Sequence, residues 1–95
     1  MNIQHDDNKA KGRFFVNDNG IDLAQMVYSW VGNNLIIIEH TEVDDQLKGQ
    51  GVGNKLVAAC VDWARSQMIK ILPLCPFAKV VFERKPEYSD VLYRK

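Results

Sequence analysis

The segment from Leu47 to Asn54 has the residue types of a phosphate-binding loop. It contains three alternating glycines and lies between a β-branched run and an apolar helical pattern. Glycine lets the backbone pass close to a bulky anion, and the amides at the start of the next helix carry a partial positive charge. A turn before an ordinary helix needs one or two glycines, so the alternation favours a pyrophosphate site.

Two better-known phosphate loops do not fit this segment. A Walker loop ends in Gly-Lys-Ser/Thr, whereas Val52, Gly53 and Asn54 follow Gly51 here. A dinucleotide-binding fingerprint that began at Gly49 would require glycine in place of Asn54. The alternating glycines therefore indicate an anion loop of another type.

The chain before the loop has the alternation of antiparallel strands. A strand pattern is followed by an Asn-rich hairpin turn, a second strand with apolar residues on one face, another turn, and a third strand that begins apolar and ends polar. These features predict a three-strand antiparallel meander, and we expect residues 1–10, including a frayed end at Met1–Asn8, to be flexible. The expected strands are Lys11 to Val16, Asp22 to Val31 and Leu35 to Val43.

The chain after the loop predicts helices and one parallel strand. A helix with a broad apolar side, extending to Met68 at its end, leads into a short strand, so the crossover places that strand parallel to the third. The fold class is therefore α+β, with a mixed sheet, one long crossover helix and short C-terminal helices. The expected elements are the helix Gly51 to Met68, the strand Ile69 to Leu72, the helix Phe77 to Lys85 and a last helical turn from Pro86 to about Tyr93.

These elements predict where the site lies. Ligands of such sheets bind beyond the carboxyl ends of parallel strands. The end of the third strand, the glycine loop and Cys75 should therefore converge.

Length and composition limit the classes of protein. The 95 residues suffice for one domain with one core, 46% are hydrophobic, and 12 basic residues balance 12 acidic ones. A nucleic-acid-binding domain normally has a basic surplus, and no segment has the length of a membrane span or the pattern of a signal peptide. We expect a cytoplasmic protein with reduced cysteines, no metal, no nucleic-acid or membrane partner, and a monomeric or weakly dimeric state.

The glycine loop resembles the signature of the GNAT superfamily, the acetyl-CoA-dependent N-acetyltransferases. That signature is Arg or Gln, two spacers, Gly, one spacer, then Gly or Ala; Lys48 to Gly53 follows it with lysine in the first place. The resemblance implies acetyl-CoA as donor, with Thr41 and Val43 on the pantetheine arm. The residues that it implies for the coenzyme A phosphates are Lys48, Gly49, Gln50, Gly51, Val52, Gly53 and Asn54.

The chain is more similar still to a short branch of predicted acetyltransferases. That branch has His-Thr-Glu-Val before the loop, then Pro-x-Cys-Pro-Phe and Pro-Glu-Tyr after it. The corresponding segments are His40 to Val43, Pro73 to Phe77 and Pro86 to Tyr88. The combined spacing extends from the first strand to Tyr88 and is more specific than any of its parts.

One motif of the larger family members is altered. They often carry Asn-x-x-Ala-x-x-x-Tyr followed by Glu, in which the tyrosine commonly acts as general acid. Cys75, Ala78, Phe82 and Glu83 occupy that frame here. The phenol is therefore missing, and a thiol replaces the asparagine.

Two side chains are candidates for the chemistry of acetyl transfer. Cys75 lies between two prolines, where a thiol could be fixed and partly exposed. It could accept the acetyl group, form a mixed disulfide with coenzyme A or contact the cofactor. The alternative is a small buried hydrophobe. His40 is the best candidate for the base that deprotonates the acceptor, and the alternative is a solvated strand-end histidine. Glu39 and Glu42 are weaker candidates.

The remaining reactive or aromatic residues have simpler interpretations. Cys60 lies on the apolar side of the long helix and is predicted to be core, as are Trp30, Trp63, Phe14 and Phe15 in the core or sheet. Tyr88 could border the cofactor or pin the terminal helix. Lys79 and Lys85 could meet the 3′-phosphate of coenzyme A, although exposed lysines are usually solvated.

The sequence thus predicts an N-acetyltransferase that moves an acetyl group from acetyl-CoA to an amine, directly or through Cys75. A non-catalytic acyl-CoA binding or sensing module fits the same cofactor features. A protein-interaction scaffold without affinity for coenzyme A is a third class.

Overall fold

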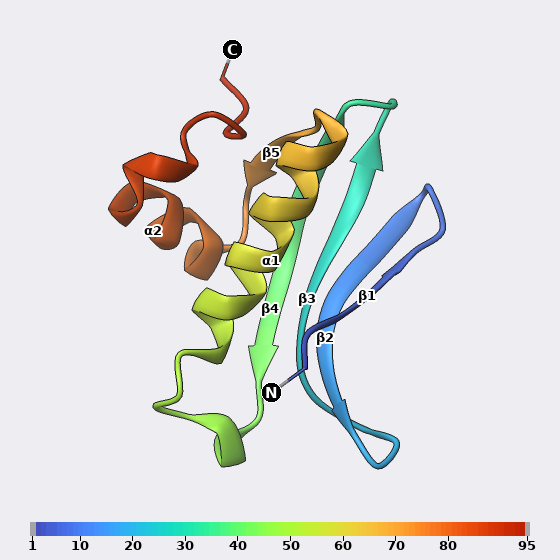
Figure 1. Cartoon of the computed structure of the whole chain (residues 1–95), viewed down its shortest axis with the longest axis vertical. Helices are drawn as coiled ribbons and strands as arrows, with labels where there is room; N and C mark the ends of the chain where they lie inside the picture. The colour runs from blue at the N-terminus through green and yellow to red at the C-terminus, as the bar shows by residue number, and fades with distance from the viewer. Residues whose placement is uncertain (1, 95) are drawn as a thin grey trace.

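The computed structural model describes residues 2–94 as a five-stranded sheet with two helices (Figure 1). The strand order is β1-β2-β3-β4-β5; the first four strands are antiparallel, and β5 is parallel to β4. The predicted α+β class is confirmed. The elements are β1 (Gln4–Asp7), β2 (Lys11–Asp18), β3 (Ile21–Val31), β4 (Leu35–Val43), η1 (Asp45–Leu47), α1 (Val52–Gln67), β5 (Lys70–Pro73), α2 (Pro76–Arg84) and η2 (Pro86–Tyr88).

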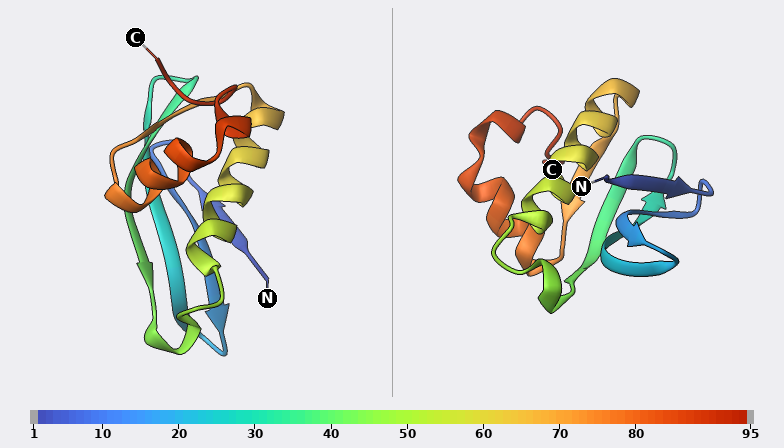
Figure 2. Two further views of the ribbon diagram at one scale, coloured as in Figure 1. Left: turned by 90° about the vertical axis from the view of Figure 1, so that its left-hand side faces the viewer. Right: turned by 60° about the horizontal axis from the view of Figure 1, so that its bottom comes forward.

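Both helices lie on the same face of the sheet (Figures 1 and 2). The apolar side of α1 packs against β3, β4 and β5, where Met26, Tyr28, Ile36 and Ile38 are fully buried. In the described part of the chain, no helix covers the opposite face, which we call the open face. None of the helices within residues 2–94 is both long and apolar enough to span a membrane.

The long helix ends one residue earlier than predicted. The sequence pattern predicts Met68 on its apolar side, but this residue caps the helix in a left-handed conformation (φ 59°) and is 85% exposed. The N–H of Met68 satisfies carbonyls of the last turn, so this residue terminates the helix instead of contributing to the core.

The prediction of a frayed N-terminus is wrong for the segment Gln4–Asp7. This segment pairs with residues 12–15 of β2 and adds a fourth antiparallel strand. The His5 ring stacks on Phe14, with centroids 4.0 Å apart, and meets the Trp63 ring edge-on at 4.7 Å. A polar four-residue strand shows no hydrophobic alternation, and only its tertiary contacts hold it in place.

The hydroxyl of Tyr28 fastens β1 to the centre of the sheet. It donates a hydrogen bond to Asp7 and lies 2.7 Å from Nε2 of His5, while the Trp30 indole donates to the same carboxylate at 2.8 Å. Gly12 makes this possible, because a Cβ at that position would overlap the phenol. Within residues 2–94, no buried polar side-chain atom is left without a hydrogen-bond partner, as a packed interior requires.

Candidate functional site

Strand β4 extends beyond its neighbour β5 and has an unpaired edge there. Pairing ends at Ile38 opposite Pro73, and the carbonyl of Ile38 then accepts the N–H groups of both Leu74 and Cys75 at 3.0 Å. The chain turns away into α2, whereas β4 runs on to Val43 (Figure 1). The second half of β4 thus presents free backbone groups to an extended ligand.

Thr41 and Val43 direct their backbone groups to this open edge. The N–H of Asp44 donates to the carbonyl of Leu23 in β3 at 2.8 Å. In an antiparallel ladder, successive residues point their N–H and C=O groups to opposite edges. Glu42 therefore faces β3, and Thr41 and Val43 face away from it.

A bulge in β4 determines which side chains share the helix-covered face. Tyr28 pairs with Ile38 but Val27 pairs with His40, so Glu39 is an additional residue. The alternation of faces shifts by one at a bulge. Ile36 and Ile38 are followed on that face by residues 41 and 43, and not by residues 40 and 42.

The glycine loop depends on backbone conformation at two of its glycines. Gly49 (φ 80°) and Gly51 (φ 69°) are left-handed, and a Cβ at either position would meet nothing within 4 Å. Gly51 caps α1, whose N-terminus has no side-chain cap and no acidic residue in its first turn. The first-turn amides thus keep the partial positive charge that attracts an anion.

The third glycine of the loop is required for space. A Cβ on Gly53 would lie 2.5 Å from Cζ of Phe77, whose ring rests on the start of α1. Phe77 is 39% exposed although it is a large apolar residue. In the sequence, Phe77 stands at the end of the Pro-x-Cys-Pro-Phe motif and at the start of an expected helix, and neither pattern indicates that its ring lies at the site.

The loop, the open edge of β4 and Phe77 enclose one groove of about 290 Å³. All the residues that the sequence assigned to a cofactor line it except Gln50 and Cys75. The side chain of Gln50 instead donates to the carbonyl of Gln46 at 3.4 Å. The lining residues are Thr41, Val43, Leu47, Lys48, Gly49, Gly51, Val52, Gly53, Asn54 and Phe77.

Cys75 lies beside this groove, behind Thr41. It is the N-cap residue of α2, and its Sγ donates to Oγ1 of Thr41 at 3.3 Å. Of the two alternatives for its exposure, the structure shows burial: the residue is only 5% exposed because α2 and the core cover it. Thr41 thus stands between the thiol and the groove.

His40 is on the other side of the sheet from Cys75. Its side chain follows the alternation onto the open face, where Nε2 lies 2.6 Å from Oε1 of Glu42 and both side chains are 58% exposed. The hydrogen bond from His40, aided by one from Gln25, holds the pKa of Glu42 below its ordinary value. Glu39 bonds to the hydroxyl of Ser29 at 2.7 Å.

The other candidate residues lie away from the groove, in the core, against a helix or on the surface. Cys60 is fully buried in α1, and burial raises the pKa of its thiol. Tyr88 packs edge-on against Phe82, with ring centroids 5.9 Å apart, so it pins the C-terminal segment. Lys79 and Lys85 are exposed. Within residues 2–94, no three His, Cys, Asp or Glu side chains gather as metal ligands do.

A second cavity of about 640 Å³ lies on the other side of α2. Leu74, Lys79, Phe82 and Tyr93 are among the residues that line it. It contains none of the residues of the glycine loop or of the open β4 edge. The chemistry suggested by the sequence motifs therefore points to the smaller groove.

The groove thus combines a loop whose amides can hold an anion with a strand edge that can pair with an extended ligand. Residues 13–91 match the model of the family described as GCN5-related N-acetyl-transferase. The chain belongs to this family.

Individual relatives agree with this assignment. Human protein NATD1 is 28% identical over 87 residues, which are 90% of this chain and 75% of the relative. The solution structure of a GCN5-like protein from Staphylococcus aureus is 40% identical, with a TM-score of 0.74, over 97% of this chain and 89% of that one. The structure of AAC(6')-Iy with a bisubstrate analogue, CoA-S-monomethyl-acetylneamine, shares the fold at 15% identity (TM-score 0.56; 93% and 71% covered).

Proposed function

We propose that this protein binds acetyl-CoA in the groove between β4 and α1 and transfers the acetyl group to an amine. The observation that carries the proposal is the junction of two backbone features: the unpaired edge at Thr41 and Val43, and the uncapped start of α1 after Gly51. The unpaired strand edge can form hydrogen bonds with the amides of a pantetheine arm, and the uncapped helix start can bind a diphosphate. Membership of the acetyltransferase family supports the same donor.

In this arrangement, the cofactor arm runs along β4 toward the end of β5. The diphosphate lies on the amides of Gly51 to Asn54, and Lys48 adds a positive charge at the loop. Lys48 is 3.0 Å from Asp45 and largely exposed, so its charge is already partly balanced and screened. Phosphate binding therefore rests mainly on the backbone.

The thiol of Cys75 can take part in transfer only through a small displacement at Thr41. In a Cys75-mediated route, Sγ attacks the acetyl carbonyl carbon, the bond from that carbon to the coenzyme A sulfur breaks, and the proton of the thiol passes to the departing thiolate. The amine then attacks the cysteine thioester, the bond from the acetyl carbon to Sγ breaks, and a proton of the amine passes to Sγ. In a direct route the amine attacks acetyl-CoA itself, Thr41 only lines the groove, and Cys75 only bonds to Thr41.

A non-catalytic acyl-CoA binding module is the second candidate. Two observations favour it: the thiol is only 5% exposed, and Phe82 stands where larger relatives carry a tyrosine. Such a module would bind acetyl-CoA without turnover.

Incubation with acetyl-CoA and a panel of amines distinguishes these functions. Steady release of free coenzyme A with an acetylated amine supports the transferase, and saturable binding without release supports the module. The absence of any binding would contradict both and leave a scaffold.

Variants of the two cysteines separate the routes of transfer. For a Cys75-mediated route we expect Cys75→Ala to retain acetyl-CoA affinity within about twofold and to lose at least about 100-fold in kcat, since the nucleophile is gone. Cys60→Ala is the matched control, because it removes the other thiol, which lies in the core. Wild-type kcat in Cys75→Ala would establish the direct route.

A further inference from the structure

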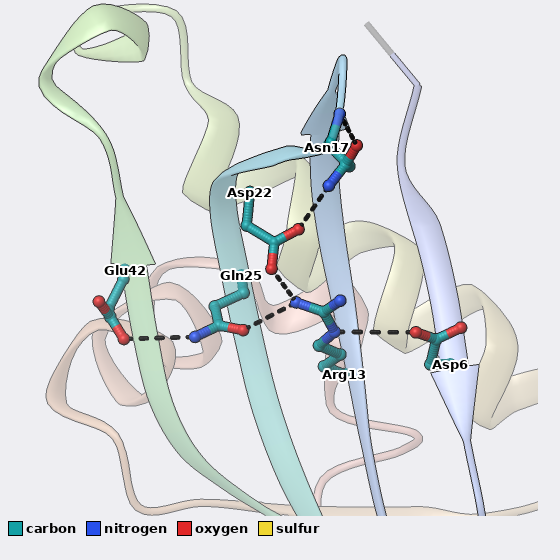
Figure 3. Close-up of polar contacts among 7 residues, drawn as sticks. Asp6, Arg13, Asn17, Asp22, Gln25 and Glu42 are labelled. Carbon is teal, nitrogen blue, oxygen red and sulfur yellow. Dashed lines mark hydrogen bonds and ion pairs between the residues drawn. The ribbon is translucent and has the colours of Figure 1, made fainter.

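Polar side chains form a continuous row across the open face of the sheet (Figure 3). Arg13 on β2 lies near Asp6 of β1 (3.8 Å), donates to Asp22 of β3 (2.6 Å), and donates to Oε1 of Gln25 (3.1 Å). Gln25 in turn donates through Nε2 to Oε1 of Glu42 on β4 (3.4 Å). The row thus ends at the open edge of β4.

The guanidinium of Arg13 determines how the Gln25 amide is oriented in this row. A guanidinium only donates hydrogen bonds, so the oxygen of the Gln25 amide must face Arg13 and its nitrogen must face Glu42. Arg13 is itself fixed, because its guanidinium carbon lies 3.8 Å from the ring centre of Phe15 and its side chain is 28% exposed. Glu42 is therefore held from the β3 side.

The last contact of the row determines the tautomer of His40. An ionised carboxylate only accepts, so Nε2 of His40, 2.6 Å from Glu42, carries a hydrogen. In the neutral ring, Nδ1 then has the free lone pair. Glu42 also fixes the orientation of the ring at a strand end where solvent would otherwise allow it to rotate.

We propose that Glu42, held by Gln25 and Arg13, is a positioning residue that keeps Nδ1 of His40 free to accept a proton from the acceptor amine at the open edge of β4. This role rests on the proposed transferase function. The acetyl group reaches the edge from the groove side, where Thr41 lies, and the amine reaches it from the open face. The bulge at Glu39 is what places His40 and Thr41 on opposite faces.

In the proposed step, His40 takes up a proton as the amine attacks acetyl-CoA. The amine nitrogen bonds to the acetyl carbonyl carbon, a proton of the amine moves to Nδ1, and the bond between that carbon and the coenzyme A sulfur breaks. The imidazolium returns its proton to solvent, and the coenzyme A thiolate takes up a proton from solvent.

Several groups of the neighbouring elements face the region of His40. On β4 these are Glu42 and Glu39, and on β3 they are Gln25, Val27 and Ser29. Glu39 accepts a hydrogen bond from Ser29 and shares no hydrogen bond or ion pair with His40. It therefore provides a matched carboxylate for control experiments.

The test combines kinetics with the spectrum of the ring. We expect Glu42→Ala to lower kcat about tenfold or more with the KM for acetyl-CoA within twofold, Gln25→Ala to have a smaller effect in the same direction, and Glu39→Gln to leave both parameters unchanged. In the ¹H–¹⁵N spectrum of the neutral ring, wild type should show the Nε2–H tautomer alone, and Glu42→Ala a mixture. Adding Glu42→Ala to His40→Ala should have no further effect, because the positioned group is already absent.

The outcomes distinguish this role from the proposed function. Turnover by wild type together with unchanged kcat in Glu42→Ala, or an unchanged tautomer pattern, would overturn the role of Glu42 alone. A wild-type protein that binds acetyl-CoA but acetylates no amine would overturn the transferase and this role together.

Discussion

The two ends of the sheet are built in opposite ways. At the β1 end, five rings pack against one another: His5, Phe14, Tyr28, Trp30 and Trp63, which we call the β1 cluster. His5 bonds to Tyr28, and Tyr28 and Trp30 both donate to Asp7. At the groove end, the loop between β4 and α1 buries none of its side chains, and its form comes from left-handed glycines. The groove is thus shaped by backbone, and packing is concentrated elsewhere.

This difference separates stability from binding. A substitution in the β1 cluster should unfold the protein without altering the affinity of the folded fraction for acetyl-CoA. A substitution in the groove should weaken binding with little effect on unfolding. Three substitutions and one pH series test this separation, in order of decreasing effect.

Gly12→Ala should be the most destabilising change. The new Cβ would overlap the phenol of Tyr28 and lie 2.7 Å from the carbonyl oxygen of Asp6, so the cluster must move apart. Overpacking of this kind costs about 3 kcal/mol, which chemical denaturation would measure. Gly20→Ala is the control, because a Cβ at that turn position would meet no other atom. This variant should lose only the free energy of placing alanine in a left-handed conformation, about 1 kcal/mol. An unfolding free energy equal to that of wild type would contradict the proposed packing.

Gly53→Ala should weaken binding instead of folding. Its Cβ would push the exposed ring of Phe77 into the groove, and we expect the Kd for acetyl-CoA to rise about tenfold, or 1.4 kcal/mol. Alanine favours the helix, so the unfolding free energy should stay within about 1 kcal/mol of wild type. The double variant Gly53→Ala/Phe77→Ala should recover most of the affinity in isothermal titration. Failure to recover would mean that Phe77 does not transmit the effect.

Mild acid should lower the stability of the protein through the β1 end and not through the groove. Burial lowers the pKa of His5 from its ordinary 6.5, and attraction to Asp7 and Asp6 offsets this only in part. In mildly acidic solution, the unfolded chain therefore binds more protons at His5 than the folded chain does. The contribution of His5 to the free energy of unfolding is complete above about pH 6.5 and is lost as the pH falls below that value. His5→Asn should flatten this part of the pH dependence, measured as the denaturation midpoint from pH 7.5 to 5. An equally steep profile in the variant would assign the effect to another group.

Lys48→Gln should have the smallest effect. Its ammonium is largely exposed and already paired with Asp45, and the proposed phosphate contacts are made by amides. We expect the Kd for acetyl-CoA to change less than about threefold at physiological salt. A tenfold loss would show that side-chain charge, and not the backbone, holds the phosphates.

The positions of the groove residues were largely predictable from the sequence, because local signals determine them. Gly49 and Gly51 are needed for their own φ angles, and the parallel β4–β5 pair follows from the strand-helix-strand order. The turn at Asn19-Gly20, with φ values of 52° and 84°, was predictable because these two residues themselves favour positive φ angles. Each of these features depends on residues close in sequence.

Features that depend on distant contacts were not predictable. Strand β1 is polar, and it is held by Tyr28 and Trp63, more than 20 residues away. The bulge at Glu39 leaves no mark in the apolar pattern, and it moves His40 to the face opposite Cys75. Phe77 reaches the groove only because Gly53 leaves room for its ring.

A map of amide chemical shifts, recorded as acetyl-CoA is added to ¹⁵N-labelled protein, locates the bound cofactor on the fold. We predict that saturable shifts concentrate at Thr41, Val43 and residues 49–54, with the β1 cluster unchanged. Shifts confined to the larger cavity around Leu74 and Tyr93, or no shifts at all, would contradict the placement of the cofactor in the groove.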